Sequence, residues 1–406
     1  MIGFYKQAVS SSNEKAQKFA MLSLNENKIT ALLKMAESDI YVEPDQLDSH
    51  PYLINFINGT YDVAAGEFRK HRREDLLTKL IQYPYRPEAR ADTWMRFLDR
   101  IMGGGPDASE CGMERAERMV SYLQCALGYS LTGKVREKAV FMCFGKGDNG
   151  KSTMLSTIGS IAEEYSVVLD INTLMTKQET NNSQSDLARL RGARFAQTSE
   201  TEEGQRLAEG KLKRITQGME DGKITATRKY ENSIEFKESH HLWMDCNHRP
   251  VIRGTENAIW NRLHLIPFEV TIAGDEKDVQ LPDKLKDEAE GILVWLVDGA
   301  TRWYQNGLQR PMETDAARDE YRKEMDPLKD FLEERCVAGS QFRARSKALY
   351  GEYCSWAQEN HQQKIINNEA FKHLLEAKNF LYKRDNAGIM VEGLGLRLKS
   401  QDSGSV

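Results

Sequence analysis

The chain has 406 residues, which suits two or three domains at the usual size of about 150 residues each. Lys and Arg number 56 and Asp and Glu 61, so the formal net charge of −5 excludes a uniformly basic, histone-like protein. A local basic patch for nucleic acid is still compatible with this charge. The longest apolar runs, such as residues 139–144 and 292–297, are far shorter than the ~18 residues of a membrane span. We therefore expect no membrane partner.

Cysteine and histidine spacing argues against structural disulfides and zinc. The six cysteines form no C-x-x-C pair, and the eight histidines form no H-E-x-x-H motif. The N-terminus lacks an apolar core of signal-peptide length. We expect reduced thiols and a cytoplasmic protein, in this case in the cytoplasm of a bacterial host.

The first third of the chain predicts a small β-structure followed by helices. Residues 53–69 alternate around an Asn58-Gly59 turn, which favours a hairpin or meander. Apolar residues from Trp94 to Ile101 recur at the i, i+3, i+4, i+7 spacing of an amphipathic helix.

Short apolar strands alternate with helical stretches in the middle of the chain, which favours an α/β fold with a largely parallel sheet. The predicted strands are residues 139–144, 167–171, 193–198, 241–245 and 263–270. Further on, helical patterns return, and the end of the chain combines helices with a turn-rich segment, the order typical of a winged helix. The predicted parts are an N-terminal region with β-hairpins (1–88), a helical, collar-like oligomerisation segment (89–134), an α/β core (135–272), a helical segment (273–327), and a winged-helix-like domain with a tail (328–406).

One motif in the α/β core predicts phosphate binding. The stretch from Gly145 to Ser152 fits G-x-x-x-x-G-K-[ST], and it follows a predicted strand and precedes a predicted helix. Backbone N–H groups of such a loop surround phosphates, Lys151 would pair with the β- and γ-phosphates, and Ser152 would hold Mg²⁺. The expected nucleotide-binding residues are Gly145, Gly147, Asp148, Asn149, Gly150, Lys151, Ser152 and Thr153. The alternative is a glycine-rich surface turn.

Polar residues follow two later strands. Glu200 would coordinate Mg²⁺ or polarise the attacking water, with Glu202 in reserve, because both tasks need a carboxylate. The alternative for Glu200 is an acidic helix N-terminus. Asn247 would orient the water or the γ-phosphate, or else belongs to a simple turn before Pro250.

Arg262 stands directly before the last predicted strand of the core. An arginine there could reach the γ-phosphate of a neighbouring subunit as an arginine finger. The alternative is an ordinary surface arginine.

Two β-like runs, residues 224–227 and 233–236, flank a basic and aromatic turn. Basic side chains neutralise phosphates and aromatic rings stack on bases, which suits single-stranded DNA. The predicted DNA-binding residues are Lys223, Arg228, Lys229 and Tyr230. The alternative is an ordinary charged hairpin turn.

These motifs together carry a resemblance. They are Gly150-Lys151-Ser152, Ser199-Glu200, Asn247-His248-Arg249-Pro250 and Trp260-Asn261-Arg262-Leu263. The set resembles the superfamily 3 helicases, and most of all the phage/plasmid primase family, over residues 50–400. The chain differs in having Asn261-Arg262 where the family often has two basic residues, and in its altered Gly218-to-Gly222 step.

The resemblance implies an AAA+ P-loop core in which Lys151 and Ser152 bind phosphate and Mg²⁺, Glu200 is the acidic residue, Asn247 the sensor and Arg262 the finger. It also implies hexameric rings with ATP at subunit interfaces, DNA in the central channel and 3′–5′ movement. We therefore expect an ATP-dependent replicative helicase of a phage or mobile element, acting on single-stranded and forked DNA.

The resemblance starts about 50 residues after Met1, so priming is expected to come from a separate primase or polymerase, or from a longer chain. Two alternatives stay open. One is a nucleotide-switch protein for origin binding or primosome assembly, and the other is a DNA-independent P-loop ATPase or kinase.

Overall fold

The computed structural model describes residues 13–23, 25–37, 41–105, 107–176, 181–198, 200–218, 222–227, 232–254, 257–274, 276–360, 365–386 and 388–397. The chain groups into two compact units. One comprises Met1–His50 with Arg72–Thr78, and the other comprises Pro51–His71 with Lys79–Val406.

The first unit contains helices α2 (Glu14–Ser23) and α3 (Glu26–Ala36). The Asn25 side chain caps α3 by accepting a hydrogen bond from Asn27 N, as a helix N-cap does. Within this unit, Asp48 Oδ1 accepts a hydrogen bond from Thr78 N at 2.7 Å, which ties the separated segment back to the first fifty residues.

The second unit opens with the predicted β-structure. Strands β1 (Leu53–Phe56), β2 (Gly59–Asp62) and β3 (Glu67–Arg69) form an antiparallel sheet, and the β1–β2 turn lies at Asn58-Gly59. The hairpin prediction is therefore confirmed, although this sheet groups with the second unit and not with the first fifty residues.

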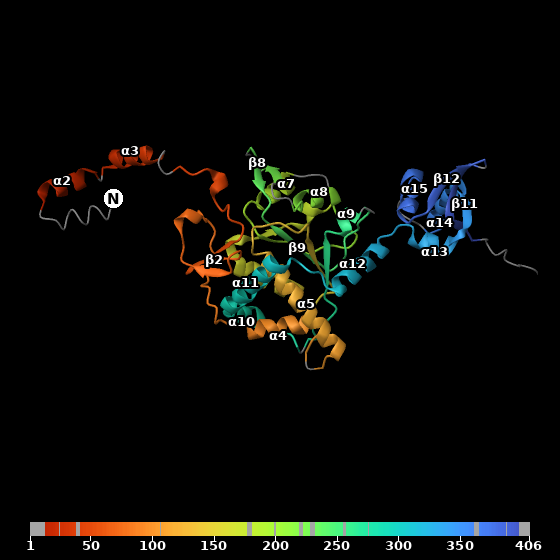
Figure 1. Cartoon of the computed structure of the whole chain (residues 1–406), viewed down its shortest axis with the longest axis horizontal. Coiled ribbons are helices and arrows are strands. Elements are labelled where there is room, and N and C mark those ends of the chain that lie inside the picture. The colour runs from red at the N-terminus through yellow and green to blue at the C-terminus, as the bar shows by residue number, and fades with distance from the viewer. Residues whose placement is uncertain are drawn as a thin grey trace, which may run out of the picture. The chain divides into compact units, whose positions relative to one another are not determined.

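A five-stranded parallel sheet forms the centre of the second unit (Figure 1). Its strands are β4 (Val140–Phe144), β5 (Ser166–Leu169), β6 (Phe195–Thr198), β9 (His241–Cys246) and β10 (Leu263–Pro267), in the order β10-β4-β9-β6-β5. Every neighbouring pair is parallel. This confirms the α/β prediction and the five strands to within a few residues at their ends.

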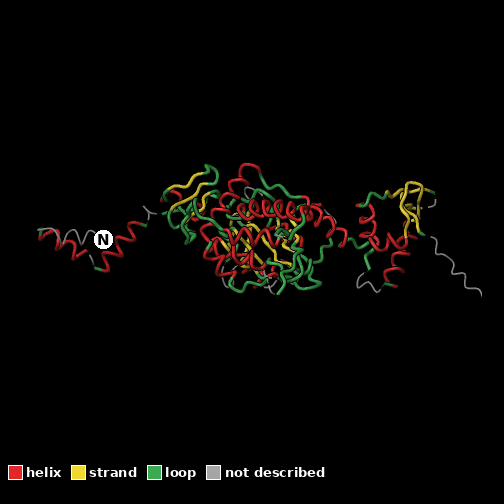
Figure 2. The backbone as a smooth tube through the Cα atoms, turned by 90° about the horizontal axis from the view of Figure 1, so that it is seen from below, coloured by secondary structure: helices red, strands yellow, loops and turns green. Residues whose placement is uncertain are grey.

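Helices cover both faces of this sheet, as Figure 2 shows for strands enclosed by helices. Phe141 and Cys143 of β4 join one hydrophobic cluster, and Val140 and Met142 join the other. Side chains of a strand point alternately to its two faces, so a strand buried on both sides is apolar throughout. This burial explains the unbroken apolar runs in the sequence.

The remaining elements of this part of the chain are mostly helices. They are α4 (Asp92–Ile101), α5 (Glu110–Tyr129), α6 (Lys151–Ala162), α7 (Asn181–Ala188), α8 (Glu209–Ile215), α9 (Asn257–Trp260), α10 (Leu281–Asp287), α11 (Ala289–Asn306) and α12 (Met312–Glu324), with the hairpin strands β7 (Lys223–Thr227) and β8 (Ser233–Lys237). Helices α5 and α11 cross where Gly128 and Gly299 lie. A Cβ at Gly128 would overlap the backbone of α11, and one at Gly299 would overlap the Gln124 carbonyl, so this crossing requires glycine on both helices.

The last part of the chain has a hydrophobic cluster of its own, beginning at Leu328. Its elements are α13 (Lys329–Arg335), β11 (Cys336–Arg345), α14 (Ser346–Glu359), α15 (Asn368–Ala377), β12 (Leu381–Asp385) and β13 (Gly388–Leu396), and its antiparallel sheet has the order β11-β13-β12. Phe331, Tyr353, Trp356 and Phe371 pack together in this cluster.

In the part of the chain that the structure describes, no helix combines the length and the apolar character that crossing a membrane requires.

Candidate functional site

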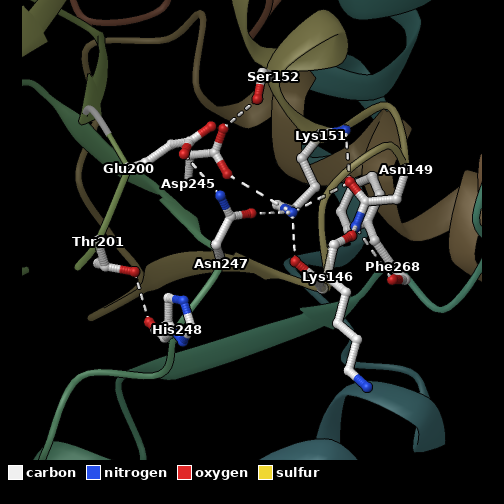
Figure 3. Close-up of polar contacts among 11 residues, drawn as sticks. Lys146, Asn149, Lys151, Ser152, Glu200, Thr201, Asp245, Asn247, His248 and Phe268 are labelled. Atoms are coloured by element: carbon white, nitrogen blue, oxygen red, sulfur yellow. Dashed lines mark hydrogen bonds and ion pairs between the residues drawn. The ribbon is translucent and has the colours of Figure 1, made fainter. Parts of the chain in front are cut away.

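Three loops that carry predicted site residues meet at one edge of the central sheet. Residues 145–152 follow β4, Glu200 comes after β6, and Asn247 follows β9. Because these strands are parallel, their carboxyl ends lie at the same edge, where open α/β sheets bind ligands. Figure 3 shows Lys151, Ser152, Glu200 and Asn247 as one group.

The glycines of the loop after β4 allow close packing. Gly150 has φ +83° and caps α6, and a Cβ there would meet the Ile101 side chain at 2.6 Å. A Cβ at Gly145 would overlap the Phe268 carbonyl. Inside the loop, Asn149 Nδ2 donates to Lys146 O at 2.6 Å, which closes the loop on itself. The loop therefore ends directly at the N-terminus of α6, where a helix dipole favours an anion.

The Lys151 ammonium lies at the centre of the site and is 2% exposed. It donates to Gly145 O at 2.7 Å, Asn149 Oδ1 at 3.1 Å and Asn247 Oδ1 at 3.0 Å. Burial lowers the pKa of Lys151, and the nearby Asp245 carboxylate opposes this shift. These acceptors hold the ammonium beside the loop. A phosphate bound there would supply a negative charge to pair with this buried cation.

Asn247 bridges the lysine and the predicted acidic residue. Its Oδ1 accepts from Lys151, while its Nδ2 donates to Glu200 Oε2 at 2.7 Å. An amide has one oxygen acceptor and two N–H donors, so this orientation gives each end the partner it requires. The structure thus brings together three of the four predicted catalytic residues.

Asp245 is a site residue that the sequence interpretation missed. It lies inside the buried strand β9, and its Oδ2 accepts a hydrogen bond from Ser152 Oγ at 2.6 Å. Its Oδ1 lies 4.0 Å from Lys151 Nζ. The available signal was an aspartate within an otherwise apolar strand, because a buried carboxylate is costly unless it has partners.

Other predicted residues lie at the margin of this group. Glu202, the reserve acid, exchanges hydrogen bonds with the Gln205 side chain. Asp148 forms an ion pair with Lys277 at 2.8 Å. Gly147 has no neighbouring atom within 4 Å of the position that a Cβ would take, and Thr153 lies in the first turn of α6.

Arg262 lies at the opposite edge of the sheet from this group. It directly precedes β10, and β10 pairs in parallel with β4 from Leu263↔Val140 to Pro267↔Phe144. Five residues at about 3.3 Å each place the two ends of the strands about 16 Å apart. Arg262 donates to Thr216 O and Ala258 O instead. The fourth predicted catalytic residue is therefore not brought to the site within one chain.

The predicted DNA-contacting strands form a two-stranded antiparallel hairpin, β7–β8. Lys223 lies at its base opposite Lys237, and Lys223 Nζ lies 3.8 Å from Glu235 Oε2. The other three predicted DNA-binding residues, Arg228, Lys229 and Tyr230, lie outside the described residues.

The base of this hairpin lies beside Arg262. Glu238 follows β8, and its Oε2 accepts from Gln217 N at 3.1 Å and from Gly218 N at 3.2 Å. The adjoining Thr216 carbonyl is the acceptor for Arg262 Nε at 3.3 Å. The short backbone segment 216–218 thus hydrogen bonds both to Glu238, at the base of the hairpin, and to Arg262.

Three family comparisons match separate parts of the chain. Residues 1–103 match the family described as D5 N terminal like, and residues 323–391 match the one described as Poxvirus D5 protein-like. Residues 143–262 match a family of unknown function, DUF5906.

Several curated viral proteins are similar to the chain at low identity. The “Putative helicase L207/L206” of Acanthamoeba polyphaga mimivirus is 26% identical over 86% of this chain and 38% of its own length. The “Putative helicase 184R” of Invertebrate iridescent virus 6 is 23% identical over 85% of this chain and 38% of its own. “Primase D5” of Fowlpox virus is 21% identical over 59% of this chain and 30% of its own. The chain thus spans well under half the length of these relatives.

Among solved structures, the apo NrS-1 C terminal region is similar with a TM-score of 0.44 and 15% identity, over 86% of this chain and 77% of that one. The D5 domain matches and the viral proteins named helicase and primase agree with the resemblance to superfamily 3 helicases that the motifs indicate.

Proposed function

We propose that the chain is the motor part of an ATP-dependent DNA helicase. The observation that carries this proposal is the convergence of Lys151, Ser152, Glu200 and Asn247 at the carboxyl edge of the parallel sheet. The names of the viral relatives, helicases and a primase, add support for a role in DNA replication.

The reaction would be an in-line attack of water on the γ-phosphate of ATP. Lys151 would contact the β- and γ-phosphates, and the Glu200 carboxylate would orient the attacking water. Asn247 would fix the position of the Glu200 carboxylate relative to the Lys151 ammonium, since it already hydrogen bonds to both.

The residues present also fit Mg²⁺. Magnesium takes oxygen ligands and is commonly held by one or two carboxylates together with substrate phosphates. Ser152 supplies a hydroxyl, and Asp245 supplies a buried carboxylate oxygen that accepts no hydrogen bond within the described residues. Bound Mg²⁺ would neutralise charge on the phosphate oxygens.

Arg262 would act on the nucleotide of a neighbouring copy. Its position at the amino edge of the sheet, about 16 Å from the chain's own phosphate loop, excludes a role in its own site. An arginine finger supplied in trans requires an oligomer, and a ring, proposed here as a hexamer, gives every site the same neighbour.

The β7–β8 hairpin would contact single-stranded DNA in the ring, through Lys223 and the predicted turn residues Arg228, Lys229 and Tyr230. Movement is proposed to run 3′ to 5′. The element order of the C-terminal part, with the sheet order β11-β13-β12, supports the winged-helix proposal. A primase or polymerase would act as a partner or as another part of a longer chain.

The test is steady-state ATP hydrolysis with and without single-stranded DNA. We expect single-stranded DNA to stimulate ATP hydrolysis by the wild-type chain. Lys151→Ala and Arg262→Ala should each be inactive, and a mixture of the two variants should recover part of the activity. Recovery follows because an intact phosphate loop in one subunit meets an intact arginine in the next.

Each alternative predicts a different result. Turnover that ignores DNA, with Arg262→Ala fully active, would indicate a DNA-independent ATPase or kinase. Tight nucleotide binding with negligible turnover would indicate a nucleotide switch for origin binding or primosome assembly.

A separate assay tests the direction of movement. Unwinding of a forked duplex with one labelled single-stranded tail would measure this polarity.

A further inference from the structure

Asp245 has an environment that a purely structural residue would not need. Its side chain is 6% exposed, inside a strand whose residues are all buried. Within the described residues, Oδ1 accepts no hydrogen bond, and the Lys151 ammonium is 4.0 Å from it. A buried carboxylate oxygen without a hydrogen-bond donor is unfavourable, so this atom is arranged for a partner that arrives with a ligand.

The other Asp245 oxygen determines what Ser152 can do. Ser152 Oγ donates its proton to Oδ2 at 2.6 Å, the short distance of a charge-assisted hydrogen bond. A serine hydroxyl has one donor and two lone pairs. With the donor committed to Asp245, the oxygen lone pairs of Ser152 remain for a cation.

Glu200 is committed to a different neighbour. Its Oε2 accepts from Asn247 Nδ2 at 2.7 Å, and Asn247 in turn accepts from Lys151. Figure 3 shows Ser152 bonded to Asp245 and Glu200 bonded to Asn247. The two carboxylates therefore have different hydrogen-bond partners, Ser152 for Asp245 and Asn247 for Glu200.

We infer that Asp245, and not Glu200, is the carboxylate that prepares Ser152 for Mg²⁺, and that Glu200 is left to orient the attacking water. Asp245 acts as a positioning residue. Its hydrogen bond with Ser152 would leave the serine lone pairs for the cation, and its Oδ1 would offer a second oxygen to the same cation. This inference rests on the proposed ATP binding, and it divides between Asp245 and Glu200 the two roles that the sequence analysis expected of Glu200.

The experiment measures the affinity for a fluorescent ATP analogue with Mg²⁺ and again with EDTA. The ratio of the two dissociation constants is the gain that the metal provides. Removal of a residue that orients a metal ligand typically costs about 10- to 100-fold in metal affinity or activity. We expect Asp245→Asn to reduce the gain about 10- to 100-fold and to leave binding in EDTA unchanged, because Lys151 and the loop are intact. Glu200→Gln should keep the gain and lose ATP turnover.

Three further variants make the test specific. Ser152→Ala should lose the gain as Asp245→Asn does, and the double variant should lose no more than either single one, since both changes disable one unit. Asp283→Asn, on the exposed part of α10, is the matched control and should behave as wild type. Binding in EDTA reports that each variant has kept its loop.

The inference would be overturned if Asp245→Asn kept the full Mg²⁺ gain or if Glu200→Gln lost it. Additive losses in the double variant would also overturn it. A wild-type chain that binds no ATP analogue in either condition would refute the proposed function itself. The two failures are therefore distinct.

Discussion

Glu238 predicts a pH-dependent stability that a single substitution removes. This carboxyl is 8% exposed at the base of the β7–β8 hairpin. Burial raises the pKa of Glu238 from 4.5 to about 7, although the N–H groups of Gln217 and Gly218 and the charge of Arg262 act in the opposite direction. The folded chain thus binds a proton on Glu238 at pH values where the unfolded chain has lost it.

The magnitude follows from the difference between the two pKa values. A shift from 4.5 to about 7 is a difference of about 2.5 units, which corresponds to about 3 kcal/mol at about 1.4 kcal/mol for each unit. The folded-state pKa is the higher one, so this stability is fully present below about pH 4.5 and is lost as the pH rises through about 7. Glu238→Gln stays neutral and should not lose it.

The assay compares thermal unfolding of wild type and Glu238→Gln at about pH 5 and about pH 8. At the lower pH the two should unfold at closely similar temperatures. At the higher pH the variant should unfold at a higher temperature, by up to roughly 6–12 °C for about 3 kcal/mol in a domain of this size. Glu235→Gln, on the exposed face of β8, is the control and should show no such pH-dependent difference.

A variant less stable than wild type at the higher pH would refute this reasoning. It would mean that the charged form of Glu238 stabilises the fold, through Arg262, more than its burial disfavours it.

Two further predictions concern packing and the choice of the acidic residue. Gly299→Ala should destabilise the chain by about 1–3 kcal/mol, because its Cβ would overlap Gln124 O of α5, while Gly351→Ala on α14 has open space and should stabilise by up to about 1 kcal/mol. Thermal unfolding of both variants checks this, and equal effects would contradict it. Glu200→Gln should abolish DNA-stimulated ATP turnover. Glu202→Gln should retain it, because this change affects only the contact with the Gln205 side chain. The reverse result would assign the role to Glu202.

Several features of the fold could be predicted from the sequence because they depend on local patterns. Strands β4, β9 and β10 are buried on both faces, so they read as continuous apolar runs. The phosphate loop is a local turn between a strand and a helix, and the positive φ of +83° at Gly150 favours glycine there.

Other elements could not be predicted because their stability comes from distant partners. Strand β11 pairs with β13, more than forty residues later, and its register shifts between Ala338 and Arg343. Half of its residues are exposed, and all of these except Ala338 are polar, so the run lacked a continuous apolar signal. The prediction for residues 1–88 also left out helices α2 and α3.

The sequence by itself determined the class of the site, because the residues of a phosphate loop act through backbone geometry that is set within a few positions of the chain. Only the tertiary structure decided which carboxylate faces Ser152 and which arginine is too distant to act in its own site. Asp245 reaches the site because β9 lies between β4 and β6, and Arg262 is excluded because it precedes β10 and does not follow it. The order and direction of strands in a sheet arise from packing between segments far apart in the chain, and local patterns do not contain that information.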